Sequence, residues 1–300
     1  MATYNQLRHV ELSAEARASM LSRHPIVAKD YTVLTPMIKA TYGLVRERVW
    51  TRRTGSFLYA RPRTGKTRCA MAIRRLLATE FQDIHIMFLS ADKRGSTSDL
   101  GFVLDLLSSE ELVINKRISY REALLKLLTH IETNLASRAG NHLVLLVDEL
   151  QLLCEADFRL LLVIHNRLEQ KKIAMTTLGF SQPEILHVRT ALATSHSFNL
   201  IARFLSEPIV FDGCAGRADL EVILEAYDTE KCYPEDTDWA YTRFFYLKHI
   251  RQGFVLEGMP KRSGPRLRRP PIRSRTGLFQ WNILPGPSSI SCLQAARRTQ

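Results

Sequence analysis

The sequence predicts an α/β fold built on a parallel sheet, with a phosphate-binding site at one edge of that sheet. Two observations predict it. Residues 57–67, FLYARPRTGKT, read as a short buried strand, a loop ending in Gly-Lys-Thr and the start of a helix. Residues 142–149, HLVLLVDE, are a longer apolar run that ends in two acids. Because open α/β sheets bind ligands at the carboxyl ends of their strands, we expect both ends to contribute to one site.

The loop after the first run matches most of the Walker A pattern, G-x-x-x-x-G-K-[ST], which cradles nucleotide phosphates. Ala60 stands where the first Gly of the pattern belongs, and Ala fits that position if its φ angle stays negative. A stretch of good helix formers follows from Arg68 to Glu80. A Gly-Lys-Thr by itself is also compatible with an ordinary loop before a helix.

Each residue at the end of this loop has a physical task. Gly65 lets backbone N–H groups approach a phosphate without a Cβ in the way, and the helix N-terminus behind it favours an anion. Lys66 is expected to reach the β- and γ-phosphate oxygens, and Thr67 to offer its hydroxyl to Mg²⁺. We therefore expect ATP and Mg²⁺ as ligands, held by Ala60, Arg61, Pro62, Arg63, Thr64, Gly65, Lys66 and Thr67.

The second run reads as a Walker B strand. Five consecutive branched residues, Leu143 to Val147, suit a central parallel strand that is covered on both faces. Asp148 is expected to hold Mg²⁺ together with Thr67, and Glu149 to act as the base that deprotonates the attacking water. By itself, the acidic pair is also compatible with an N-cap for a helix starting near Leu150. The two motifs together favour an ATP-type site.

The remaining elements follow from periodicity, caps and β-branched runs. Strands are expected at 57–60, 84–89, 142–147, 173–178 and 208–211. Helices are expected at 13–22, 36–50, 66–80, 99–109, 119–138, 150–171, 183–193 and 196–205.

Two further residues are candidates for catalysis. Thr177, near the end of its strand, is the first choice for a side chain that senses the γ-phosphate, with Thr176, Ser181 and Gln182 as alternatives; a β-branched strand residue without that role is the competing interpretation. Arg203 precedes the last strand, where an arginine can reach a γ-phosphate in a neighbouring subunit. Arg189 is the second candidate for this role, and a plain surface arginine is the competing interpretation.

The predicted domain organisation has four parts: an N-terminal arm at 1–24, an α/β nucleotide-binding domain at 25–215, a small helical lid at 216–259, and a basic tail rich in Pro and Arg at 260–300. The tail holds nine Lys and Arg residues and no acid, which leaves 33 basic and 30 acidic residues in 1–259. The net charge of +12 is therefore largely made by the tail, and nucleic-acid binding does not follow from the total. The tail is expected to be disordered.

Composition excludes several classes of protein. The 300 residues contain five scattered cysteines and no C-x-x-C pair, so neither a disulfide framework nor a cysteine zinc site is predicted. No apolar run is long enough to cross a bilayer, and residues 1–17 lack the apolar segment of a signal peptide. We expect a cytoplasmic protein with reduced thiols and no membrane partner.

The order of these features resembles the AAA+ ATPases: a phosphate loop at 60–67, acids at 148–149, a polar strand at 173–178, an arginine before a last strand, and then a helical lid. Within that superfamily, the segments PRTGKT, LVLLVDELQLL, LGFSQPEIL and the ARF at Arg203 look like the TnsC/TniB transposition regulators of Tn7-like elements. The resemblance covers about residues 20–255. Ala60 in place of Gly and the composition of 260–300 depart from it.

The resemblance implies a P-loop NTPase domain of three αβα layers with a parallel sheet, followed by a small lid that is incomplete by residue 259. It implies a homo-oligomer, a ring or filament on double-stranded DNA of any sequence, that links a target-selector protein to a transposase and is disassembled by ATP hydrolysis. Lys66, Thr67 and Asp148 would then bind ATP and Mg²⁺, with Glu149 as base, Thr177 as sensor and Arg203 as a finger across the interface. A signalling or defence NTPase and a helicase-loader-like AAA+ ATPase are the alternatives.

Overall fold

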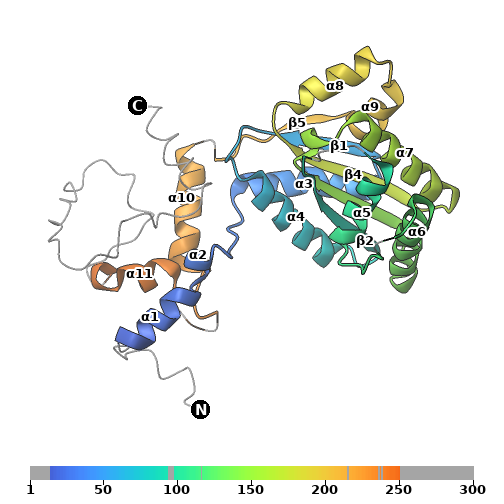
Figure 1. Cartoon of the computed structure of the whole chain (residues 1–300). Coiled ribbons are helices and arrows are strands. Elements are labelled where there is room, and N and C mark those ends of the chain that lie inside the picture. The colour runs from blue at the N-terminus through green and yellow to red at the C-terminus, as the bar shows by residue number, and fades with distance from the viewer. Residues whose placement is uncertain are drawn as a thin grey trace. The chain divides into compact units, whose positions relative to one another are not determined.

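The computed structural model describes residues 14–93, 98–115, 117–214, 216–235, 237 and 239–250. The chain divides into two compact units, one made of Met37–Gly213 and the other of Met1–Pro36 together with Cys214–Gln300 (Figure 1). The predicted tail at 260–300 and the first residues of the predicted arm lie outside the described residues.

The Met37–Gly213 unit is organised around a parallel sheet of five strands in the order β2-β3-β4-β1-β5. The strands are β1 (Gly55–Tyr59), β2 (Ile84–Ser90), β3 (His142–Asp148), β4 (Ala174–Ser181) and β5 (Pro208–Val210). β3 is buried along its whole length, as its run of branched residues predicts. The α/β fold class with a parallel sheet is thereby confirmed.

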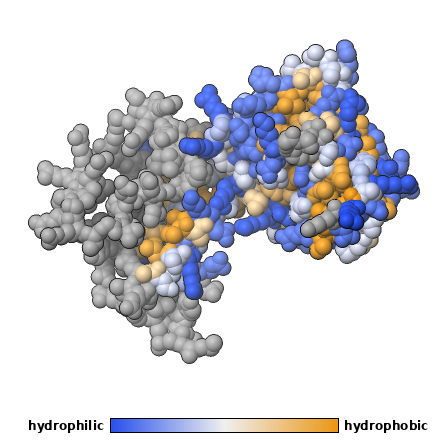
Figure 2. Space-filling view, viewed as in Figure 1, coloured by the Kyte–Doolittle hydropathy of each residue, from blue (hydrophilic) through white to orange (hydrophobic). Residues whose placement is uncertain are grey.

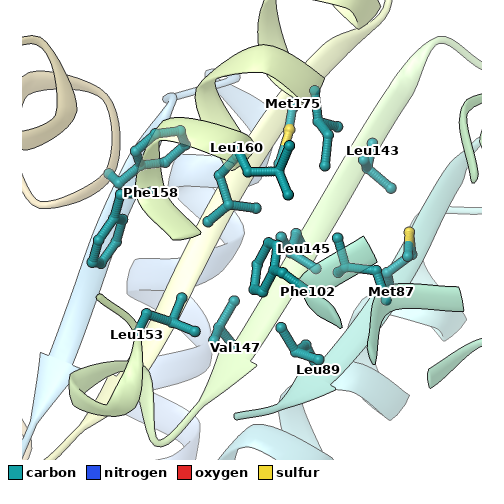
Figure 3. Packing of buried hydrophobic residues seen from close by; sticks show 14 of the residues in the cluster. Met87, Leu89, Phe102, Leu143, Leu145, Val147, Leu153, Phe158, Leu160 and Met175 are labelled. Carbon is teal, nitrogen blue, oxygen red and sulfur yellow. The ribbon is translucent and has the colours of Figure 1, made fainter. Parts of the chain in front are cut away.

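Helices cover both faces of this sheet. Leu143, Leu145 and Val147 of β3 belong to one apolar cluster with Phe102 and Phe158 from the helices (Figure 3). The alternate residues of β3 are also buried and face the other side, where the phosphate-loop helix packs against the strand. The helices are α3 (Pro36–Trp50), α4 (Lys66–Glu80), α5 (Asp99–Ser109), α6 (Tyr120–Ser137), α7 (Glu155–Gln170), α8 (Ile185–Thr194) and α9 (Phe198–Phe204).

The helix predicted at 150–171 is divided in the structure. A single turn of 3₁₀ helix, η2 (Leu150–Leu152), follows β3, and Leu153 is extended before α7 begins. The Asp157 carboxylate accepts a hydrogen bond of 2.9 Å from the Cys154 backbone N–H, which fixes the start of α7. The break keeps Glu149, at φ 55°, outside any α-helix and at the end of its strand.

β4 continues three residues beyond the predicted end at 178. Gly179, Phe180 and Ser181 still pair with β1, and Phe180 also lies opposite Asp148 of β3. Gly179 is required by packing rather than by a turn, because an added Cβ would lie 2.3 Å from Cδ2 of Leu150. The extension brings Ser181 one residue beyond the level of Asp148, at the carboxyl end of the sheet.

Arg48 is buried near the end of α3. Its side chain is 11% exposed and pairs with Glu207, whose backbone carbonyl accepts a hydrogen bond of 3.0 Å from Phe57. The neighbouring arginines in the sequence, Arg46, Arg52 and Arg53, are exposed, and Arg48 alone among these four is buried. The pair joins α3 to the residue before β5.

The second unit has its own core, made from both ends of its sequence. Its helices are α1 (Ala14–Arg23), α2 (Pro25–Ala28), α10 (Arg217–Glu225) and α11 (Tyr241–Ile250), with a π-helical turn η3 (Ala226–Glu230). His24 is fully buried, and its ring lies 4.8 Å from those of Tyr233 and Tyr241. Tyr31 contacts Tyr227 with a hydrogen bond of 3.0 Å between hydroxyls. Residues 25–36, which the sequence placed with the sheet, therefore pack with the helical unit.

The visible face of the Met37–Gly213 unit mixes hydrophilic residues with smaller apolar areas (Figure 2). Among the helices that the structure describes, none combines the length and the apolar character that a membrane span requires.

Candidate nucleotide-binding site

The carboxyl ends of three strands bring the candidate residues to one edge of the sheet. Tyr59 of β1 lies opposite Ser181 of β4, and Asp148 of β3 lies opposite Phe180 of β4. The phosphate loop leaves the end of β1 and leads into α4. The loop and the two acids, which are about 80 residues apart in the sequence, therefore meet as the Walker motifs predict.

The loop has the backbone that a phosphate cradle needs. Arg63 has φ 65° and Gly65 has φ 94°, so two residues of the loop lie in the left-handed region. Such conformations turn successive N–H groups toward one point, where an anion is stabilised. Ala60 does not have a positive φ and its N–H donates to the Ser181 carbonyl over 3.1 Å, so Ala meets the condition set for the first position of the motif.

Lys66 lies over the loop. Its Nζ donates hydrogen bonds to the carbonyl oxygens of Ala60 and Arg61, at 3.0 and 2.9 Å. The side chain is buried, and burial lowers the pKa of Lys66, while the charges of Glu149 and Asp148 oppose that shift. The ammonium is bonded to two neutral carbonyl oxygens and lies near two acids. Such an ammonium stabilises the negatively charged oxygens of a phosphate that enters the loop.

Thr67 and Asp148 form the contact between the two motifs. Thr67 Oγ1 donates a hydrogen bond of 2.7 Å to Oδ2 of Asp148. Asp148 is 3% exposed, and burial raises its pKa above the ordinary value, opposed by the hydrogen bond from Thr67. A hydroxyl and a buried carboxylate side by side are oxygen ligands of the kind that Mg²⁺ prefers, so the residues present fit the expected metal.

Glu149 is held by two amide side chains. Its Oε2 accepts a hydrogen bond of 2.9 Å from Nε2 of Gln182 and another from Nε2 of Gln151. Gln151 Oε1 in turn accepts from the Ser181 hydroxyl at 2.8 Å and from the Gln182 backbone N–H at 3.0 Å. The network orients the expected base. The sequence indicates Gln182 only as an alternative sensor, and its sole signal for Gln151 is the place of that residue two positions after Glu149.

Thr177, the first choice for a sensor, is not brought to the site. It lies opposite Leu145 within the sheet, three residues before Phe180, which is the partner of Asp148. Its side chain is 1% exposed, and Oγ1 has no hydrogen-bond partner among the described residues. With a rise of about 3.3 Å per residue, Thr177 lies roughly 10 Å from the level of Asp148. Ser181 and Gln182 occupy the strand end instead.

The two candidate arginines lie on neighbouring helices. Arg203, at the end of α9, pairs with His165 and lies 3.6 Å from a carboxylate oxygen of Glu169, both on α7. Its side chain is 34% exposed and therefore partly accessible. Arg189 Nε donates to the Leu205 carbonyl over 3.1 Å. Neither arginine is bonded to the phosphate-loop residues in these contacts.

The rest of the predicted loop is open to solvent. Arg61, Pro62 and Arg63 are exposed, and Thr64 Oγ1 donates to the Arg61 carbonyl over 2.9 Å, which closes the turn. These side chains are therefore accessible to solvent, and we expect the backbone with Lys66 and Thr67 to supply the contacts to an anion.

Comparison with known proteins agrees with this geometry. Residues 51–188 match the family model described as the AAA domain. That range begins just before β1 and ends within α8, so it contains the phosphate loop, both acids and Gln182. No curated protein matches the sequence.

Solved structures of replication proteins are similar to parts of the chain. The Aeropyrum pernix ORC2 protein is 12% identical with a TM-score of 0.48, covering 67% of this chain and 54% of that one. The Aeropyrum pernix ORC1 protein in complex with DNA is 17% identical with a TM-score of 0.46, covering 70% and 52%. Domain III of the Thermotoga maritima replication initiation protein DnaA is 14% identical with a TM-score of 0.38, covering 78% and 92%. The chain thus spans about half the length of the two Aeropyrum proteins.

Three observations agree on the same region of the chain: the family match, the five-stranded parallel sheet and the hydrogen bond between Thr67 and Asp148. The Met37–Gly213 unit has the AAA-type P-loop NTPase fold, and its residues 51–188 match the AAA domain model.

Proposed function

We propose that the protein hydrolyses ATP to ADP and phosphate with Mg²⁺. The hydrogen bond between Thr67 and Asp148, beside the buried ammonium of Lys66, is the observation that carries this proposal. It supports the proposal because a buried ammonium, a hydroxyl and a carboxylate lie together beside one backbone loop. When bound, Mg²⁺ would neutralise charge on the phosphate oxygens.

The residues of the chain would divide the work as follows. Lys66 exchanges the carbonyls of Ala60 and Arg61 for phosphate oxygens. Thr67 and Asp148 hold the metal. Glu149 takes the proton of the attacking water, and the amide of Gln182 positions its carboxylate for that step. A general base contributes about 10²–10⁴-fold to such a step, so loss of Glu149 removes hydrolysis while binding remains.

We further propose that the ATP-bound protein assembles on double-stranded DNA and regulates transposition, linking a target-selector protein to a transposase. The similarity to TnsC/TniB regulators supports this proposal. The segments of this chain that resemble those regulators include LVLLVDELQLL and LGFSQPEIL, which contain Glu149 and the glutamines bonded to it. The ARF segment contains Arg203. Arg203 would leave His165 and Glu169 to reach a nucleotide bound by a neighbouring subunit. Loss of the γ-phosphate on hydrolysis would then remove its partner and loosen the assembly.

The helicase-loader-like alternative shares the ATPase site and differs in its partner. It predicts selective binding to a replicative helicase, whereas the transposition proposal predicts assembly on duplex DNA of any sequence. A signalling NTPase would form partner-driven oligomers that are indifferent to DNA.

Electron microscopy of the full chain with linear duplex DNA tests these proposals. We would compare a non-hydrolysable ATP analogue, ADP and no nucleotide. Rings or filaments that form on DNA with the analogue alone support the transposition proposal. Assembly that ignores DNA contradicts it and favours the signalling alternative, and capture of a replicative helicase without DNA assembly favours the loader.

Two control proteins sharpen this comparison. A chain that lacks residues 260–300 removes nine basic residues, so DNA binding that vanishes with them and ignores nucleotide comes from the tail alone. The Lys66→Ala variant keeps the tail but loses the phosphate ligand. It is expected to form no assembly with the analogue, and assembly by this variant would contradict nucleotide control.

A further inference from the structure

Three side chains that metals favour converge far from the nucleotide site. His85 is the second residue of β2, Glu110 follows the end of α5, and His130 lies within α6. In Figure 1, α5 and α6 lie beside β2 at one edge of the sheet, and both helices contact that strand. Among the described residues, these three form a group whose ligand atoms all lie within 4.8 Å of one another.

The cluster has the spacing of a first coordination shell. Glu110 Oε2 lies 3.2 Å from Nε2 of His85 and 3.1 Å from Nε2 of His130. In a tetrahedral zinc site, ligands at about 2.0–2.2 Å from the metal are separated by about 3.3–3.6 Å. These two separations are within a few tenths of an ångström of that edge, and the two histidine ligand atoms lie within 4.8 Å of each other, so a small closing movement would admit an ion.

His85 points to a missing ligand. Its side chain is 7% exposed, and its Nε2 is buried with no hydrogen-bond partner in the described part of the chain, although Glu110 is near. Glu110 Oε2 is bonded to His130, and, although burial acts in the opposite direction, both imidazoles lower the pKa of Glu110, so one carboxylate oxygen is shared between two buried or half-buried rings. A buried imidazole nitrogen without a partner costs stability, and a lone pair directed at a metal would remove that cost.

The donor set indicates the class of ion. Two imidazoles and one carboxylate form a set that zinc uses, whereas Mg²⁺ and Ca²⁺ take oxygen ligands almost alone. Glu110 and His130 are 10% and 22% exposed, which leaves a path from solvent. Asn134 Nδ2 lies 3.2 Å from Nε2 of His130 and would lose or change that contact when the ion binds.

We propose that His85, Glu110 and His130 bind a divalent transition-metal ion of the zinc class, with a water molecule in the fourth position. The ion joins the end of α5 and the middle of α6 to the edge strand β2. His85 lies five residues before Ser90, which pairs with Asp148, so the site is about 16 Å along the strand from the nucleotide site. It is therefore separate from the Mg²⁺ site proposed above and does not depend on that proposal.

Cobalt absorption and zinc competition test the proposal. Full-length protein without a polyhistidine tag is titrated with Co²⁺ in excess Mg²⁺ and without nucleotide. We expect one ion per chain, a visible spectrum of tetrahedral cobalt, displacement by Zn²⁺, and no thiolate charge-transfer band. Thermal unfolding should shift upward with Zn²⁺, because a ligand that binds only the folded state stabilises it.

Single substitutions locate the ion. His130→Gln and Glu110→Gln keep the approximate size of each side chain and are expected to weaken Zn²⁺ binding by at least about 100-fold, since loss of an outer-shell partner alone costs about 10–100-fold. His196→Gln removes an exposed histidine elsewhere and should bind Zn²⁺ as the unsubstituted chain does.

His130→Gln also separates loss of metal binding from loss of folding. His130 is the most exposed of the three ligands, so its substitution should disturb the fold least. Its circular dichroism should match that of the unsubstituted chain. Retention of tight Zn²⁺ binding by this folded variant overturns the proposal. So does a cobalt spectrum with thiolate bands, or binding that no substitution in the cluster weakens.

Discussion

Thr67 and Asp148 are 81 positions apart in the sequence and are joined by a hydrogen bond of 2.7 Å. The bond spans the start of α4 and the end of β3, so it fixes the helix that follows the phosphate loop against β3. It also keeps a hydroxyl and a carboxylate together, although burial opposes the charge of Asp148. Because carboxylates whose pKa is shifted by burial gather at functional sites, this environment supports the proposed metal role of Asp148.

Asp148→Asn is expected to separate activity from stability. The amide keeps the size of the carboxylate but removes the charge that would hold Mg²⁺, so the rate of ATP hydrolysis should fall by at least about 100-fold. Because burial raises the pKa of Asp148, removal of its charge should leave the melting temperature unchanged or higher. Phosphate release at varied Mg²⁺ and thermal unfolding measure the two effects. Thr67→Ser, which keeps the hydroxyl, is the control and should retain most of the activity; a hydrolysis rate in Asp148→Asn near that of Thr67→Ser would contradict the metal role.

Substitutions of Gln182 and Thr177, the two candidate sensor residues, are expected to have opposite effects on kcat. Gln182→Leu removes the amide that bonds Glu149, so we expect kcat to fall by about 10-fold or more with little change in ATP affinity. Thr177→Val removes a buried hydroxyl without a partner among the described residues, so we expect unchanged kcat and equal or greater stability. Steady-state ATPase assays and nucleotide titrations check both. If only Thr177→Val lowers kcat, the assignment from the sequence is right and the one from the geometry is wrong.

The contrast between these two residues shows what the sequence could and could not predict. The strand runs, the loop spacing and the acidic pair are local patterns, so the sheet and the junction of Lys66, Thr67 and Asp148 were predictable. The length of β4 depends on packing. Gly179 and Pro183 look like turn signals, but Gly179 lies within the strand. Glycine is favoured at this position because the Leu150 side chain leaves no room for a Cβ.

Contacts between side chains that are far apart in the sequence could not be predicted either. The His85, Glu110 and His130 cluster draws on three elements with no spacing motif, and the Arg48 pair with Glu207 joins residues 159 positions apart. Both depend on which face of a helix meets which strand. A helix of weak amphipathic pattern, such as α3, does not reveal that face from its sequence.

Mixing variants tests whether Arg203 acts across a subunit interface. Arg203→Ala should lower ATP hydrolysis by about 10³-fold, and Glu149→Gln should lower it through loss of the base. In a mixture, some interfaces combine an intact Glu149 from one subunit with an intact Arg203 from the next, so activity should partly return. The measurement is phosphate release against mixing ratio on duplex DNA.

Arg189→Ala is the matched variant for the mixing experiment, because Arg189 donates to the Leu205 carbonyl near the same sheet edge. If Arg203 is the finger, a mixture of Arg189→Ala with Glu149→Gln shows no recovery beyond the activity of its separate components. Recovery with Arg189→Ala alone would move the role to that residue. No recovery in either mixture would mean that neither arginine acts in trans.

The buried His142 predicts a loss of stability in mild acid. Burial lowers the pKa of His142 to about 4 from an ordinary value of 6.5, and Nε2 shares a hydrogen bond of 2.9 Å with Thr176 Oγ1. Between these pH values the unfolded chain binds a proton that the folded chain does not. The free energy of unfolding should therefore decrease as the pH falls from about 6.5 to about 4, by roughly 3 kcal/mol from this residue.

The double variant His142→Leu with Thr176→Val isolates that contribution. Removing both partners leaves no unpaired polar atom of this pair, so stability at pH 7.5 should change little, while the decrease between pH 6.5 and 4 becomes smaller by about the amount assigned to His142. Urea unfolding of both proteins across this range measures the difference. His24, whose pKa burial also lowers to about 4, lies in the other unit and gives both proteins the same remaining slope. Parallel pH profiles would show that His142 becomes protonated in the folded chain as readily as in the unfolded chain, and that its burial does not exclude the charge.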